Sequence, residues 1–123
     1  MHNSCEYSRV QGGGSEERIK VNDDGSINIT NKDKSLYVSV GSEHAEYFLG
    51  IRGEGAYIVE FSLPDWVNES IRQNAIPQDH ASQNIFNDYL PKIVDPTKPG
   101  LSYQLPPSWL GFIQDVAYNA HIV

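Results

Sequence analysis

Three side chains in this sequence have the chemistry to hold an anionic ligand that carries hydroxyl groups. Arg9 stands in an alternating segment that ends at the glycine run Gly12–Gly14. A planar guanidinium binds phosphate or sugar oxygens in two directions at once, and glycines let the backbone approach a ligand closely. Ser39 offers a hydroxyl and Gln78 an amide, and both groups hydrogen-bond to sugar hydroxyls. These residue types are compatible with binding of a phosphate or ribose group.

The same residues also have purely structural interpretations. An arginine on a strand is commonly a surface or ion-pairing residue, and a serine on a strand often faces solvent. A glutamine in a loop often caps backbone groups. For Ser39 and Gln78 the sequence leaves both interpretations open.

Strands predicted from alternation would position these side chains. Arg9 shares a face with Tyr7, and Ser39 shares a face with Tyr37, opposite the apolar residues of its segment. Asn22–Gly25 predicts a hairpin turn. The predicted strands cover residues 6–10, 18–22, 26–30, 36–40, 56–62, 92–95 and 101–104.

Three helices are predicted between and after these strands. The first runs from an N-cap at Ser42 to Arg52 and ends at Gly53. The second has its N-cap signal in Ser62–Asp65 and packs through Trp66, Val67, Ile71 and Ala75, and the third follows Pro106 and packs through Trp109, Leu110, Ile113, Val116 and Ala117. The mixed order of elements predicts an α+β fold, a small mixed or antiparallel sheet with flanking helices.

Length and composition limit the possibilities. With 123 residues we expect one domain spanning 1–123. The net charge of −7 argues against binding along a nucleic acid, which depends on Lys and Arg neutralising phosphates. Cys5 is the single cysteine and the four histidines are scattered, so we expect no metal site. No apolar run suits a signal peptide or a membrane span.

Several segments together resemble the C-terminal toxin domains of Rhs-type bacterial polymorphic toxins. They span nearly the whole chain and comprise residues 7–15, 18–27, 38–40 with 44–49, 75–78 and 91–97. The local pattern also resembles an ADP-ribosyltransferase of the Arg-Ser-Glu type. In that resemblance Arg9 takes the arginine position, Ser39 the serine position, and the third position falls to Gln78, with Asp79, Asp95 and Glu60 as rivals because no late Glu-x-Glu or Gln-x-Glu pair occurs.

The resemblance implies an ADP-ribosyltransferase-like fold and NAD as the substrate that is consumed. Gln11 and Gly12, which follow the arginine, and the aromatic residues Tyr37 and Tyr47 are the further candidates for contacts with NAD. It also implies a cognate immunity protein, a bacterial protein target such as elongation factor Tu, and delivery within a larger secreted toxin to the cytoplasm of a target bacterium.

Two other functions remain open on the sequence. A metal-independent ribonuclease toxin would use His80 or His44 as the acid–base group and Arg9 or Lys92 to hold the phosphate. A non-enzymatic binding module is the second, and the acidic composition and the missing late glutamate both favour it.

Overall fold

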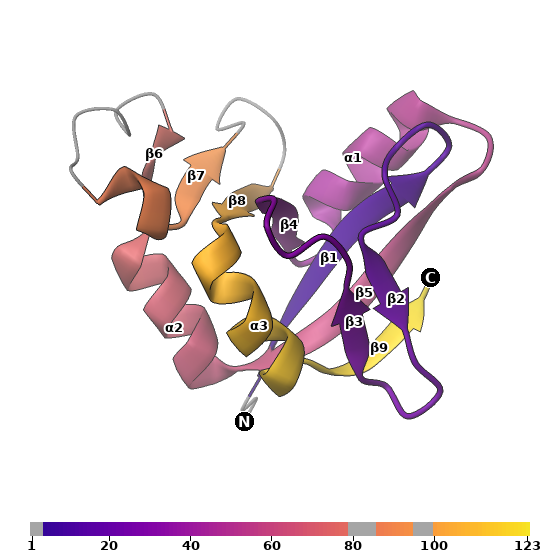
Figure 1. Ribbon diagram of the computed structural model, residues 1–123. Coiled ribbons are helices and arrows are strands. Elements are labelled where there is room, and N and C mark those ends of the chain that lie inside the picture. The colour runs from indigo at the N-terminus through magenta and orange to yellow at the C-terminus, as the bar shows by residue number, and fades with distance from the viewer. Residues whose placement is uncertain (1–3, 79–85, 95–99) are drawn as a thin grey trace.

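The computed structural model describes residues 4–78, 86–94 and 100–123 and confirms an α+β fold (Figure 1). None of the helices in these ranges is long and apolar enough to cross a membrane. The strands are β1 (Ser4–Gly12), β2 (Ile19–Val21), β3 (Ile27–Ile29), β4 (Leu36–Val40), β5 (Ala56–Pro64), β6 (Ile76–Pro77), β7 (Lys92–Val94), β8 (Leu101–Leu105) and β9 (Tyr118–Ile122). The helices are α1 (Glu43–Arg52), α2 (Asp65–Asn74), the short 3-10 helix η2 (Asn87–Tyr89) and α3 (Pro107–Val116).

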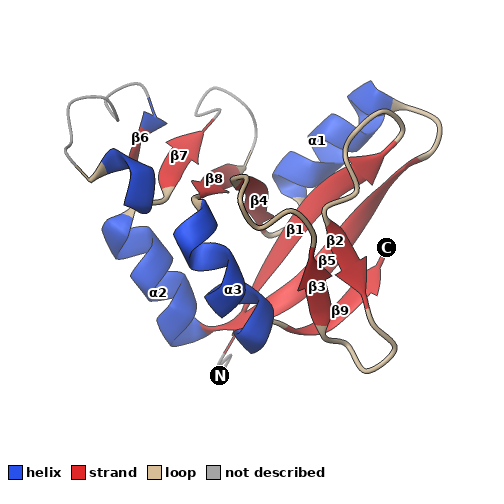
Figure 2. Ribbon diagram, in the orientation of Figure 1, coloured by secondary structure: helices blue, strands red, loops and turns tan. Residues whose placement is uncertain are grey.

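Seven of the strands form one mixed sheet in the order β6-β7-β8-β4-β1-β5-β9. Neighbours pair antiparallel except for β6 and β7, which are parallel. The strands β2 and β3 pair only with each other, as the hairpin that the turn at Asn22–Gly25 predicts (Figure 2). The inner position of β1, between β4 and β5, places Arg9 near the middle of the sheet.

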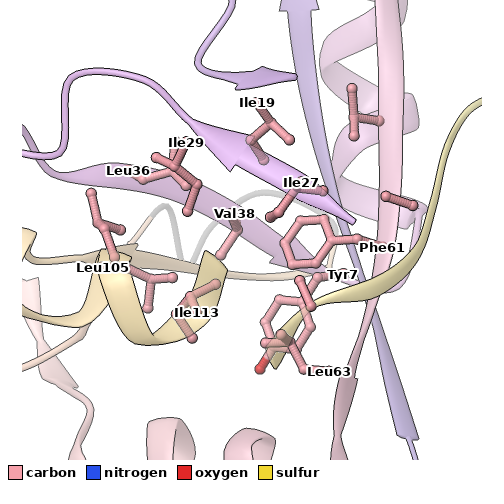
Figure 3. Close-up of a cluster of buried hydrophobic side chains, with 14 of the residues drawn as sticks. Tyr7, Ile19, Ile27, Ile29, Leu36, Val38, Phe61, Leu63, Leu105 and Ile113 are labelled. Atoms are coloured by element: carbon pink, nitrogen blue, oxygen red, sulfur yellow. The ribbon is translucent and has the colours of Figure 1, made fainter. Parts of the chain in front are cut away.

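The two faces of the sheet are covered by different elements. The main core lies under α2, α3 and the β2–β3 hairpin, and the rings of Tyr7 and Phe61 stack within it at 5.9 Å (Figure 3). A smaller cluster of Val10, Ala45 and Ile58 packs α1 against the other face. Alternation along β1 and β5 therefore supplies side chains to both layers.

The first helix follows its sequence signals closely. It begins after Ser42 and ends at Gly53, whose φ of 76° is in the left-handed region that favours glycine. The N–H of Gly53 donates to the carbonyl of Leu49. The Ser42 hydroxyl makes no capping hydrogen bond, so the helix start depends on packing more than on its cap.

The prediction for the second helix was wrong in two details. The strand β5 continues past Ser62, where the predicted strand ends, through Pro64, and Pro64 itself is the N-cap of the helix. Trp66 is 62% exposed, because Val67 and Ile71 form the buried stripe and Trp66 lies beside it. Its ring packs against Phe112 of α3.

The glycine run forms a tight turn as predicted. Gly12 and Ser15 exchange backbone hydrogen bonds of 3.0 and 2.9 Å, and Gly12 to Gly14 all have positive φ. A Cβ on Gly12 would lie 2.5 Å from the carbonyl oxygen of Gly55. The close approach that this glycine permits is therefore between two loops of the protein.

Candidate functional site

Arg9 lies where two neighbouring strands stop pairing. β1 pairs with β5 along its whole length, but with β4 only at Tyr7 and Ser8. Beyond Ser8 the Arg9 guanidinium joins β4 to the segment after the glycine turn. Its Nη1 donates to the carbonyl of Tyr37 and its Nη2 to the carbonyl of Glu16, both at 3.0 Å. A side chain thus replaces main-chain pairing at this point of the sheet.

The surroundings of the Arg9 guanidinium disfavour its positive charge. Its Nε is buried and makes no hydrogen bond in the described structure. Burial above all, and then the positive charges of Arg18 and Arg52, lower the pKa of Arg9 to about 10, while Glu16 acts in the opposite direction. An anion bound beside Arg9 would compensate this charge.

A cavity of about 550 Å³ opens beside Arg9, which we call the Arg9 cavity. It brings together all three residues that the sequence suggests for catalysis: Arg9, Ser39 and Gln78. Tyr37, one of the candidates for NAD contact, lines it as well. The remaining lining residues are Val10, Ser15, Glu16, Val38, Ala45, Phe48, Arg52, Val94 and Ser102.

Ser39 lines this cavity although it is only 6% exposed. Its Oγ lies 2.7 Å from Oγ of Ser102, the residue directly opposite on β8. The alternation of β4 is as predicted, because Val38 belongs to the main core while Ser39 points to the other face. The interpretation of Ser39 as a serine on a solvent-facing strand surface is therefore wrong.

Gln11, Gly12 and Tyr47 are not among the lining residues. Gln11 is buried, and its amide nitrogen donates to the Ile19 carbonyl at 2.8 Å and to the Tyr57 hydroxyl at 3.1 Å. Its amide oxygen accepts from the backbone N–H groups of residues 18 and 19. Gln11 therefore fastens the β2–β3 hairpin to β1. Tyr47 reaches the cavity only indirectly, with its ring 5.2 Å from and edge-on to the lining residue Phe48.

Two charged lining residues were not predicted from the sequence. Arg52 extends from the last turn of α1, with its guanidinium 5.7 Å from the centre of the Phe48 ring. Its helical spacing from Ala45 and Phe48 is the sequence signal that places it on this face. Glu16 follows the glycine turn and forms a 3.1 Å salt bridge with Lys34, which holds the pKa of Glu16 below its usual value.

The charge balance of the Arg9 cavity is opposite to that of the chain. Arg9 and Arg52 outnumber Glu16, the single acidic residue among the described lining residues, whereas the whole chain carries −7. Of the rivals for the third catalytic position, Glu60 lies beside His121 and does not line this cavity. Asp79 and Asp95 lie outside the described residues.

Arg18 supports the walls of the site from within the protein. Its buried guanidinium donates to four main-chain carbonyls, those of Thr30, Asn31, Lys34 and Ser35, at 2.7 to 3.0 Å. The carboxylate of Glu16 lies 3.7 Å from Arg18 Nε. Arg18 thereby joins the segment that carries Glu16 to the loop that enters β4.

The residues proposed for a ribonuclease are only partly described. His80 and the side chain of His44 lie outside the described part of the chain. Lys92, on β7, donates to the carbonyl of Leu90 at 3.3 Å. The described residues therefore bring no histidine to the Arg9 cavity.

Comparisons of the chain with protein-family models, with curated proteins and with solved structures found no match.

Proposed function

We propose that this chain is a toxin domain of the Rhs type that transfers ADP-ribose from NAD to a bacterial macromolecule. The observation that carries the proposal is that Arg9, Ser39 and Gln78 line one cavity of about 550 Å³. That volume lies within the range of about 300–1,000 Å³ typical of small-molecule sites. The positive lining of this cavity in an acidic chain supports an anionic ligand.

Arg9 is the proposed anchor for the pyrophosphate of NAD. Its two terminal nitrogens already hold the carbonyls of Tyr37 and Glu16, so the guanidinium is fixed before a ligand arrives. The guanidinium carries five N–H donors, so these two hydrogen bonds leave others for an anion in the cavity. Fixed donors cost little further ordering when the ligand binds, which favours both affinity and catalysis.

The proposed reaction proceeds at the ribose of NAD. The bond between C1′ and the nicotinamide nitrogen breaks, and its electron pair leaves with nicotinamide. The cationic ribose then accepts an electron pair from a nucleophile of the target, which releases a proton. Ser39 and the amide of Gln78 would orient the ribose through its hydroxyls, and the Glu16 carboxylate would stabilise the positive charge that develops.

The proposal includes partners that follow from the resemblance. We propose a cognate immunity protein, and elongation factor Tu as the first target to test. The domain would be delivered within a larger secreted toxin to the cytoplasm of a target bacterium.

The test is to incubate the purified domain with NAD and a bacterial lysate, and to measure nicotinamide release and labelling of protein by biotinylated NAD. We expect release and a labelled band with the unchanged chain, and neither with Arg9→Ala. Arg72→Ala is the matched control, because Arg72 is an exposed arginine paired with Glu69 on α2. No NAD turnover with any lysate would refute the proposal.

Arg9→Lys separates the geometry of the anchor from its charge. Lysine keeps the positive charge but has one nitrogen, so it cannot hold the two carbonyls and a phosphate in the directions that the guanidinium does. A hydrogen bond to a charged group is worth about 1.5–3 kcal/mol, so we expect NAD affinity to fall about tenfold or more, measured by calorimetry. Unchanged NAD affinity in Arg9→Lys would show that NAD binding does not need the planar geometry of the guanidinium.

A further inference from the structure

A second cluster of chemically active side chains lies away from the Arg9 cavity. Glu6 of β1, Glu60 of β5 and His121 of β9 each offer one ligand atom, and these atoms lie within 4.8 Å of one another. A separate cavity of about 570 Å³, lined in part by Glu6, His121 and the hairpin residues Asp23 and Asp24, adjoins the cluster. The two cavities share no lining residue.

Sheet register produces this cluster. Glu60 stands directly opposite His121, and Glu6 stands opposite Ser62, two positions further along β5. The residues that follow the glutamates, Tyr7 and Phe61, point into the main core. The two carboxylates therefore emerge on the other face of the sheet, where His121 can join them.

The orientation of the imidazole is fixed from outside the cluster. Nδ1 of His121 lies 3.0 Å from the main-chain carbonyl oxygen of Asn119, to which it donates, and Nε2 lies 3.1 Å from a carboxylate oxygen of Glu60. A neutral ring protonated on Nδ1 carries its lone pair on Nε2. A metal-binding histidine is commonly held in this way, with its second nitrogen bonded to a carbonyl or carboxylate.

We propose that Glu6, Glu60 and His121 bind a divalent transition-metal ion of the Zn²⁺ class. In the neutral tautomer the Nε2 lone pair and one oxygen of each carboxylate lie within 4.8 Å of one another, and a cation between them would compensate the two negative charges. One nitrogen and two carboxylate ligands suit zinc, with water completing the coordination. His121 is well exposed, so an ion has access to the site. The proposal departs from the sequence, in which the scattered histidines predicted no metal site.

The ion would fasten the C-terminal strand to the sheet. β9 is an edge strand, and its pairing with β5 is irregular between Glu60 and Ser62. Ligands from β1, β5 and β9 would be held by one centre, so the metal would stabilise the folded state over the unfolded one.

The test is calorimetric titration of the full chain with ZnCl₂ after EDTA treatment and removal of the chelator, with thermal melting in parallel. We expect one Zn²⁺ per chain and a rise in Tm. His121→Ala and Glu60→Gln should each weaken zinc binding by about tenfold or more and abolish the rise in Tm. Glu69→Gln, an exposed glutamate of α2, is the matched control and should bind zinc as the unchanged chain does.

No stoichiometric zinc binding by the unchanged chain would overturn the proposal. Equal affinity in the unchanged chain and in folded His121→Ala would overturn it as well. The His121 side chain is exposed, so its replacement gives a result even where Glu60→Gln unfolds the protein. Neither zinc titration nor thermal melting with zinc involves NAD, so the metal site and the proposed transferase activity are tested independently.

Discussion

Replacing Arg18 by methionine tests whether one buried cation holds the framework of the Arg9 cavity. The substitution keeps an apolar stem and removes the donors that bond four main-chain carbonyls. Because water can reach these partly buried carbonyls, each lost bond is valued near the low end, about 1 kcal/mol, which gives about 4 kcal/mol. Relief from burying the charge offsets part of this loss. We therefore expect the free energy of unfolding to fall by about 3 kcal/mol.

Urea denaturation followed by circular dichroism measures this change. With a slope of about 1.5–2 kcal/mol per molar urea, a loss of about 3 kcal/mol lowers the midpoint by about 1.5–2 M while the slope stays constant. Lys20→Met is the matched control, because Lys20 is an exposed cation two residues further along the chain and should change stability by no more than about 0.5 kcal/mol. A loss below about 1 kcal/mol in Arg18→Met would refute the reasoning.

Three further predictions concern the backbone turn, the core and the cysteine. Gly13→Ala places a Cβ 2.8 Å from the Ala56 nitrogen, whereas the Cβ of Gly14→Ala meets nothing within 4 Å, and both glycines have positive φ. Thermal melting should therefore show Gly13→Ala to be less stable than Gly14→Ala by about 1 kcal/mol or more, and equal Tm values of the two variants would contradict this. Tyr7→Phe removes a hydroxyl that donates to Asn68 at 2.6 Å and should cost about 1 kcal/mol in urea denaturation; no loss would mean that water replaces the bond. Burial first, and then the charge of Asp65, raises the pKa of the Cys5 thiol. Its alkylation by iodoacetamide, followed by mass spectrometry, should therefore reach half its maximal rate above pH 9.0. Asp65→Asn should lower the pH of that midpoint, and an unchanged midpoint would exclude the charge effect.

Much of the fold could be predicted because its signals are local. The hairpin turn at Asn22–Gly25, the alternation of Leu36–Val40 and the glycine at the end of α1 each specify an element within a few residues. β9 was not predicted although Tyr118, Ala120 and Ile122 alternate with polar residues, because the segment is short and only Ala120 of its five residues is buried. Its pairing with β5 is a tertiary contact that the local sequence does not encode.

The candidate site was predictable only in part, because alternation gives the direction of a side chain but not what covers it. Every second residue of β1 points to the same side of the sheet, and on that side lie Tyr7, Arg9 and Gln11. Their surroundings nevertheless differ. Tyr7 is buried in the main core, and Gln11 is enclosed because the β2–β3 hairpin packs over it. Arg9 lies at a cavity because the pairing of β4 with β1 ends at Ser8.

The position of Arg9 at the end of that pairing also bears on the proposal that Arg9 binds a ligand. Two hydrogen bonds to carbonyls would suffice to join the strands, and a neutral amide such as glutamine could supply donors without a buried charge. The guanidinium instead carries a charge that burial and two neighbouring arginines disfavour, and its Nε has no partner in the described structure. An anionic ligand in the Arg9 cavity would compensate that charge. We therefore expect a pyrophosphate-containing ligand such as ADP-ribose to stabilise the unchanged chain in thermal melting, by about 2.7 kcal/mol at a hundredfold excess over its Kd, and to leave Arg9→Gln unaffected. Equal stabilisation of both chains would show that Arg9 serves the sheet alone.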